Sequence, residues 1–203
     1  MRLRAAAVVL LALMGVTRIP AADEPVRLVA QWSSPESAGK KFYKILAMGI
    51  ADDRELRHRF EDKMVSHLRG QDILAVTSYS MVPDLMAPGS REEILKKIEA
   101  QHIDAAITFR LVPLGKQEES AWDAEWMRQT QEAGTLRELI ASSLPLKLEK
   151  SETYGVEVTL WAEATPARQW TARTAPHGIK ALRQGSTMLI QDVIQTLRYY
   201  HKI

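Results

Sequence analysis

The chain has 203 residues, of which 46% are hydrophobic and 26% charged, with 10 glycines and 9 prolines. This length and composition predict a globular protein of one domain, and they exclude a fibrous, collagen-like or fully disordered chain. The formal net charge is +2, and Arg2, Arg4 and Arg18 lie in the N-terminal segment. The nearly neutral remainder excludes a general binder of nucleic acid or anionic membranes, because such proteins concentrate basic residues on one surface.

The first residues have the three parts of a secretory signal peptide. Met1–Arg4 is positively charged, Ala5–Val16 is an uncharged and mostly apolar run, and Ile19–Ala22 ends in the small residues at which the signal peptidase cuts. The apolar run would form a helix of about 18 Å, which is shorter than the roughly 30 Å hydrocarbon core of a bilayer. We therefore predict a signal peptide over residues 1–22, a periplasmic protein over residues 23–203, and no stable membrane span after cleavage.

Cysteine is absent, which excludes disulfides, thiolate metal sites, cysteine nucleophiles and lipidation at an N-terminal cysteine. The histidines show no metal-ligand spacing. His58 and Asp62 share one face of a predicted helix, but a single pair falls short of the three or four ligands of a zinc site. We expect no metal ion and no other cofactor.

The first half of the predicted domain alternates strands with helices. Apolar runs predict strands at 26–32, 44–50, 73–79 and 104–111. A repeat of apolar side chains at every fourth position predicts a helix after Asp53, with Leu56, Phe60, Met64 and Leu68 on its buried face. The order strand, helix, strand, helix, strand from position 44 onwards predicts largely parallel pairing.

The second of these helices is predicted from Ser90 to about His102. Ser90 and Glu93 match a capping box, in which Ser90 serves the free backbone amides and Glu93 reaches back. The apolar residues that follow complete the pattern of a helix start.

The chain changes character after Pro113. Residues at about 113–150 are polar, and we predict a helical excursion from the domain there. Residues 154–162 and 168–174 predict a hairpin in which Trp161 and Trp170 face each other, and 186–200 predicts a closing helix. The predicted fold class is therefore α/β, with a single small mixed sheet, a strand-helix-strand-helix-strand core, a C-terminal hairpin and a closing helix.

Two sets of residues are candidates for binding. Asp52 and Asp53 follow a predicted buried strand, at the edge where open α/β sheets place ligand sites, but capping of the next helix explains the same residues with nothing further and is the favoured interpretation. In the excursion, Trp122 and Trp126 share a helical face beside Asp123 and Glu125. This set is a protein interface if the indole rings are exposed, or a structural anchor if they pack on the sheet.

Several short segments of the sequence, in their order and spacing, resemble a family of small, largely uncharacterised envelope lipoproteins of Gram-negative bacteria. These segments are Trp32–Pro35, Gly39–Leu46, Gly49–Asp53, Leu56–Arg57, Phe60–Asp62, Ser78–Tyr79, Pro83, Trp161 and Trp170–Arg173. The resemblance implies a small α/β sandwich similar to the lipoprotein activators of penicillin-binding proteins and to the N-terminal domain of the Tol β-propeller protein. It implies no catalytic residues.

The chain departs from that family in two places. It lacks the lipidated cysteine, so we expect a free periplasmic protein rather than one anchored to the outer membrane. It also has Ala162 and Pro166 where the family's hairpin turn tends to hold Asp and Gly, and proline cannot adopt the positive φ that glycine offers.

Together, these features predict a non-enzymatic accessory protein of the cell envelope that binds another envelope protein. The alternative is a binder of a small envelope ligand, such as a glycan or lipid fragment, in a cleft near Asp52.

Overall fold

The structure is a computed structural model that describes residues 25–85, 87–114, 124, 126–128, 134–142, 148, 152–163 and 168–203. Within these residues, one sheet has its strands in the order β1-β6-β5-β4-β2-β3, and β7 pairs with β5. The strands are β1 (Leu28–Ser33), β2 (Lys44–Ile50), β3 (Leu74–Thr77), β4 (Ala105–Pro113), β5 (Thr153–Ala162), β6 (Arg168–Thr174) and β7 (His177–Gly178).

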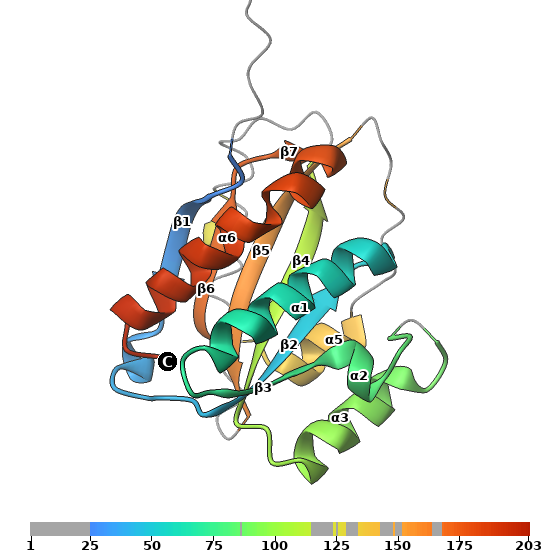
Figure 1. Ribbon diagram of the computed structural model, residues 1–203, viewed down its shortest axis with the longest axis vertical. Coiled ribbons are helices and arrows are strands. Elements are labelled where there is room, and N and C mark those ends of the chain that lie inside the picture. Colours follow the sequence, from blue (N-terminus) through green and yellow to red (C-terminus); the bar gives the residue numbers. More distant parts are fainter. Residues whose placement is uncertain are drawn as a thin grey trace, which may run out of the picture.

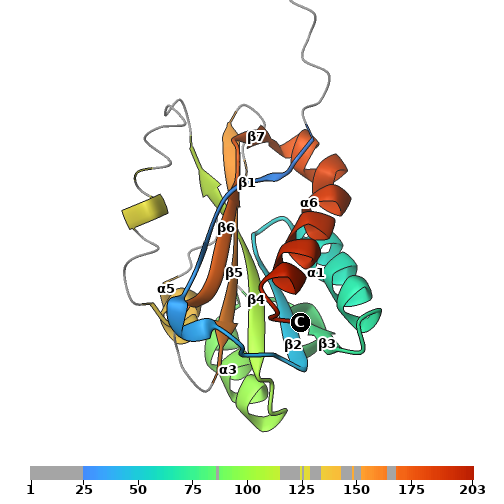
Figure 2. The same ribbon diagram turned by 90° about the vertical axis from the view of Figure 1, so that its left-hand side faces the viewer.

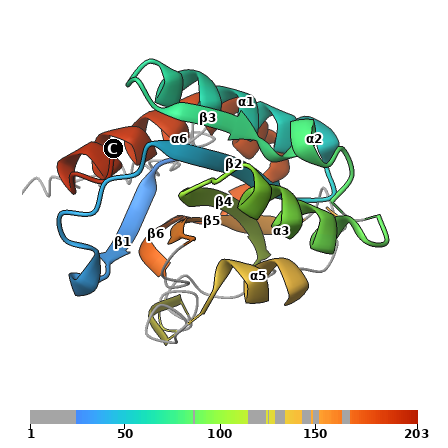
Figure 3. The ribbon, with the colours of Figure 1, turned by 90° about the horizontal axis from the view of Figure 1, so that it is seen from below.

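Helices cover both faces of this sheet (Figure 1). Seen from below, α1 and α6 lie on one face, and α3 and α5 lie on the other (Figure 3). The helices are η1 (Pro35–Ser37), α1 (Arg54–Arg69), α2 (Ser78–Met81), α3 (Ser90–Ala100), α5 (Leu136–Ser142) and α6 (Ile179–Tyr199). The predicted α/β class with a single mixed sheet is confirmed. None of the described helices is both long enough and apolar enough to cross a membrane.

The parallel part of the sheet is the predicted alternating core. β2 pairs in parallel with β3 on one side and with β4 on the other. The remaining pairs, β4 with β5, β5 with β6 and β6 with β1, are antiparallel. The C-terminal hairpin is therefore formed by β5 and β6, and the N-terminal strand β1 closes the sheet at its outer edge (Figure 2).

The main apolar core lies between the sheet and the pair α1 and α6. Phe60 on α1 is 2% exposed and stacks on Phe109 of β4, with ring centroids 5.1 Å apart. Leu56, Met64 and Leu68 join it, as the four-residue repeat predicts. A smaller apolar core lies on the α3 and α5 face, around Met48, Ile94, Ile98, Leu136 and Ile140.

Several predicted boundaries were wrong. β3 ends at Thr77 instead of continuing to Tyr79, because the chain turns there into α2 and both Ser78 and Tyr79 bind Glu61 of α1. The closing helix begins at Ile179, earlier than predicted.

The predicted capping box is also wrong. Gly89 is the N-cap of α3, with φ 81°, and no side chain caps the helix. Glu93 pairs instead with Lys97, one turn further along, at 2.7 Å. A glycine in the left-handed region directs the chain into the helix here, and that conformation is strained for other residues.

Trp161 and Trp170 lie on opposite faces of the sheet, which corrects the prediction that they face each other. Trp170 is paired with Leu160, and the register shifts immediately afterwards, so that Trp161 pairs with Arg168. Successive residues of a strand point to opposite faces. Trp170 therefore joins the main core, whereas Trp161 joins the smaller one.

Candidate functional site

A buried polar network joins α1, β2 and α2. Both oxygens of the Glu61 carboxylate accept hydrogen bonds. Oε1 accepts from Gly49 N at 2.8 Å, Arg57 Nε at 2.9 Å and Ser78 Oγ at 2.7 Å, and Oε2 accepts from Tyr79 N at 3.1 Å. The carboxylate is 0% exposed and the Arg57 side chain 4%. Because each group has several partners, the network fixes the chain as it leaves β3.

Arg57 extends this network to the loop after α2. Its Nη2 donates to Ser78 Oγ at 2.8 Å and to the Val82 carbonyl at 3.2 Å, and its Nη1 donates to the Pro83 carbonyl at 3.2 Å. Glycine at position 49 permits the close approach of helix and strand. Residues of β2, α1, α2 and the loop after α2, at positions 49, 57, 61, 78, 79 and 83, therefore meet at one structural junction.

The structure gives Asp53 the capping role. Its carboxylate accepts from Leu56 N at 2.9 Å and forms an ion pair with Arg183 of α6. Burial favours a higher pKa, but the hydrogen bonds from Leu56 and Arg183 outweigh it, so the pKa of Asp53 lies below its ordinary value. Asp52, the residue before it, is exposed. The ion pair of Asp53 and Arg183 therefore joins the start of α1 to α6. Of the two interpretations of Asp53, helix capping accounts for its contacts.

His58 and Asp62 of α1 both contact Tyr79 of α2. The Tyr79 hydroxyl donates to the Asp62 carboxylate, and this bond raises the pKa of Tyr79. The His58 ring lies against the Tyr79 ring, with centroids 4.1 Å apart. In the part of the chain that the structure describes, no group of three or more His, Asp or Glu side chains is placed to hold a metal ion.

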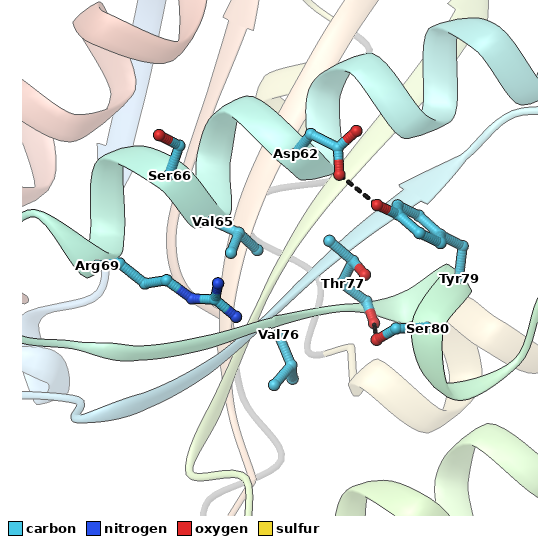
Figure 4. Close-up of a pocket in the computed structure, with 8 residues that line it drawn as sticks. All are labelled: Asp62, Val65, Ser66, Arg69, Val76, Thr77, Tyr79 and Ser80. Atoms are coloured by element: carbon cyan, nitrogen blue, oxygen red, sulfur yellow. Dashed lines mark hydrogen bonds between the residues drawn. The ribbon is translucent and has the colours of Figure 1, made fainter.

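Asp62 and Tyr79 also line a shallow hollow between α1 and β3 (Figure 4). Its volume is about 420 Å³, and Val65, Arg69 and Val76 are among its other lining residues. We call it the α1–β3 hollow. It opens at the outer edge of the sheet, since β3 is the last strand on this side.

The edge strand β3 is protected by side chains. Arg69 donates to the Ala75 carbonyl through Nε at 3.2 Å and Nη2 at 2.9 Å. Ser80 Oγ donates to the Thr77 carbonyl at 2.7 Å. A free strand edge can pair with another chain, and proteins commonly block such edges. Arg69 and Ser80 cover two carbonyls that an added strand would need.

A second shallow hollow lies along β3, and we call it the β3 edge hollow. Its volume is about 600 Å³, and Lys44, Arg69, Asp72 and Leu74 are among its lining residues. Leu74 is 68% exposed. Its backbone amide donates to the carbonyl of Tyr43, which is itself 66% exposed. Two large apolar side chains are therefore exposed where β2 and β3 begin.

The predicted tryptophan interface is only partly within the described residues. Trp126 is 1% exposed and packs with Leu114, and Ala30 and Trp32 of β1 lie against this cluster. The Arg173 guanidinium lies 5.9 Å from the centre of its ring. Trp126 thus fits the structural-anchor alternative. Trp122, Asp123 and Glu125 lie outside the described residues.

A polar row crosses the sheet on the α3 and α5 face. Arg110 of β4 is in register with Glu157 of β5, which is in register with Arg173 of β6. Arg110 Nη2 lies 3.1 Å from Glu157 Oε2. Beside this row, Trp161 Nε1 donates to Thr108 Oγ1 at 3.0 Å. This row was not predicted from the sequence, although opposite charges within strands that pair are a usable signal.

No protein-family model matches the chain, and no curated protein matches it. Among solved structures, the PelC dodecamer from Paraburkholderia phytofirmans is 16% identical and has a TM-score of 0.43, with the match covering 86% of this chain and 96% of that one. A single-residue variant of the same dodecamer is 15% identical, with a TM-score of 0.43, covering 83% and 96%.

Proposed function

We propose that the protein is a non-enzymatic accessory protein of the cell envelope that binds another envelope protein through the β3 edge. The exposed Leu74 on the wall of the β3 edge hollow carries this proposal. A large apolar side chain that is two-thirds exposed, beside a hollow and charged residues, is typical of a protein contact. The resemblance to small envelope lipoproteins supports the same class of function.

The chemistry of the surface defines the partner. Lys44, Arg69 and Asp72 are the ionisable residues of the hollow, which leaves one positive charge in excess. Among the described residues, Arg69 bonds to a backbone carbonyl and has no carboxylate partner. The partner segment therefore presents an apolar side chain to Leu74 and an acidic side chain to Arg69. It docks through side chains, because Arg69 and Ser80 block pairing with β3.

Site-specific photocrosslinking in the periplasm tests this proposal. A photoreactive phenylalanine analogue at Leu74 is expected to capture one envelope protein. The same analogue at the exposed Lys180 is the control, since α6 begins at the opposite end of the molecule from β3 (Figure 1). The captured peptide is expected to hold an apolar and an acidic residue close together.

A charge exchange then decides between a specific contact and chance capture. Arg69→Glu is expected to abolish capture, and replacing the partner's acidic residue with lysine is expected to restore it. Failure of the exchange to restore capture, or equal capture from Lys180, would overturn the proposal. Capture of a second copy of this chain would replace the proposed partner with self-association.

The compartment is part of the same proposal and rests on the signal-like segment at 1–22. N-terminal sequencing of the exported protein is expected to begin at Ala22 or Asp23. An intact Met1 on protein that stays with the inner membrane would overturn the soluble periplasmic form.

A further inference from the structure

The α1–β3 hollow has opposite charges at its two ends (Figure 4). Asp62, Val65 and Arg69 line it from α1. Residues three and four positions apart share one face of a helix, so these side chains follow one another along the hollow. Asp62 and Arg69 are two turns, or about 10 Å, apart along the helix axis. Val65 lies between them, and Val76 lines the hollow from β3.

Asp62 and Arg69 differ from the other carboxylates and arginines of α1. Those form ion pairs, namely Glu55 with Arg59, Glu61 with Arg57, and Arg54 with Asp84. Within the described residues, Asp62 bonds to the Tyr79 hydroxyl and has no basic partner, and Arg69 bonds to a backbone carbonyl and has no carboxylate partner. At about 10 Å, roughly one Debye length, the two exposed charges compensate each other little. The hollow therefore has one uncompensated charge of each sign.

Both charged groups are held in place and keep capacity for a ligand. Asp62 accepts the Tyr79 bond through Oδ1, and a carboxylate offers about four acceptor positions. Arg69 uses Nε and Nη2 on the Ala75 carbonyl, and a guanidinium has five N–H donors. The Arg69 guanidinium extends towards Val65 in Figure 4. A group that is already positioned loses little conformational entropy when a ligand binds.

We propose that the α1–β3 hollow binds a small zwitterion whose ammonium and carboxylate groups are separated by a short apolar chain. The ammonium pairs with Asp62, the carboxylate pairs with Arg69, and the chain lies against Val65. The volume of about 420 Å³ falls within the roughly 300–1,000 Å³ of small-molecule sites. Simple α-amino acids do not fit this pattern, because their two charges are on adjacent atoms of the chain.

This site goes beyond protein binding at the β3 edge. Arg69 lines both hollows, whereas Asp62 lines the α1–β3 hollow and not the β3 edge hollow. Changes at Asp62 therefore test the zwitterion site while leaving the surface around Leu74 as it is.

Titration of the full chain, followed by NMR of its backbone amides, tests the ligand class. The probe is 6-aminohexanoate, which is expected to shift the Val65 and Ser66 amide signals to saturation. Hexanoate and hexylamine have a similar chain with only one of the two charges, and each is expected to bind about ten-fold more weakly or less, as the loss of a charge-assisted hydrogen bond predicts. Glycine, whose charges are adjacent, is expected not to bind. Binding of any of these three as tight as that of 6-aminohexanoate would overturn the proposal.

Matched variants assign the binding to this hollow. Asp62→Asn keeps an acceptor for the Tyr79 hydroxyl and removes the charge, so it is expected to fold and to bind 6-aminohexanoate no better than hexanoate. Glu55→Gln removes a carboxylate that is 61% exposed on the same helix and does not line the hollow, so it should bind normally. Absence of saturable binding to the natural chain, or equal weakening by the two variants, would overturn the proposal. Photocrosslinking from Leu74 in the Asp62→Asn variant tests the protein contact separately, and capture there is expected to be unchanged.

Discussion

A Cβ added to Gly49 would lie 2.9 Å from Arg57 Cγ and 3.2 Å from Arg57 Cα. Real side chains do not tolerate the first of these distances, so α1 packs on β2 as closely as a glycine permits. That approach places the Gly49 amide 2.8 Å from the Glu61 carboxylate. The absence of a Cβ at position 49 therefore allows the hydrogen bond from Gly49 to Glu61 to form.

Gly49→Ala is expected to destabilise the protein by about 1–3 kcal/mol, because the helix must move or Arg57 must leave its rotamer. Chemical denaturation measures the change. Gly70→Ala is the control: its φ of −67° is open to any residue, and an added Cβ meets nothing closer than 3.5 Å. Equal stability of the two variants would show that α1 can shift without cost.

Glu61→Ala is expected to cost about 3–5 kcal/mol, because it leaves the Arg57 charge buried without its carboxylate. α1 provides a matched comparison in Glu55 and Arg59, which have the same four-residue spacing and lie 2.8 Å apart with side chains 61% and 39% exposed. Glu55→Ala is expected to cost less than about 1 kcal/mol. Thermal or chemical unfolding of both variants measures the difference, and similar losses would contradict the role given to burial.

The comparison of these two pairs shows what local sequence reasoning can and cannot predict. The parallel core was predictable because apolar runs and an apolar stripe every fourth residue are local signals. In sequence, Arg57 and Glu61 look like Glu55 and Arg59, an ion pair on a helix. The two pairs differ in burial. The burial of Arg57 and Glu61 depends on Gly49 of β2 and Ser78 of α2, which are far from them in the sequence.

The candidate surfaces were harder to predict for the same reason. The capping role of Asp53 follows from its position before a helix, and it was anticipated. The row of Arg110, Glu157 and Arg173 depends instead on the register of three strands. The β3 edge hollow depends on the place of β3 at the edge of the sheet, which brings Lys44 and Arg69 beside Leu74.

The ion pair of Asp53 and Arg183 predicts a dependence of stability on pH. The pKa of Asp53 is lower in the folded chain than its ordinary value of 3.8. Its contribution is therefore fully present above about pH 4 and is lost as the pH falls through the folded pKa. Arg183 is 42% exposed, so the contribution is about 1 kcal/mol or less.

Asp53→Asn keeps a capping acceptor and removes the charge, so it isolates the ion pair. The variant is expected to be slightly less stable than the natural chain at pH 7 and equally stable near pH 2. Unfolding curves at both values measure this. Glu93→Gln, at an exposed pair on α3, controls for the loss of one surface carboxylate, and a difference that persists at pH 2 would contradict the assignment.

The two interpretations of Trp126, a structural anchor and an interface residue, predict different results for its substitution. Because it is 1% exposed and packs with Leu114, Trp126→Ala is expected to cost about 3–5 kcal/mol through the cavity that it leaves. Met127→Ala changes the next residue, which is 45% exposed, and should alter stability by less than about 0.5 kcal/mol. If Trp126→Ala unfolds like the natural chain yet loses its envelope partner, the ring must be accessible and the contact site lies at Trp126. If stability falls as expected while folded molecules still crosslink through Leu74, partner binding and the packing of Trp126 are separate properties of opposite ends of the sheet.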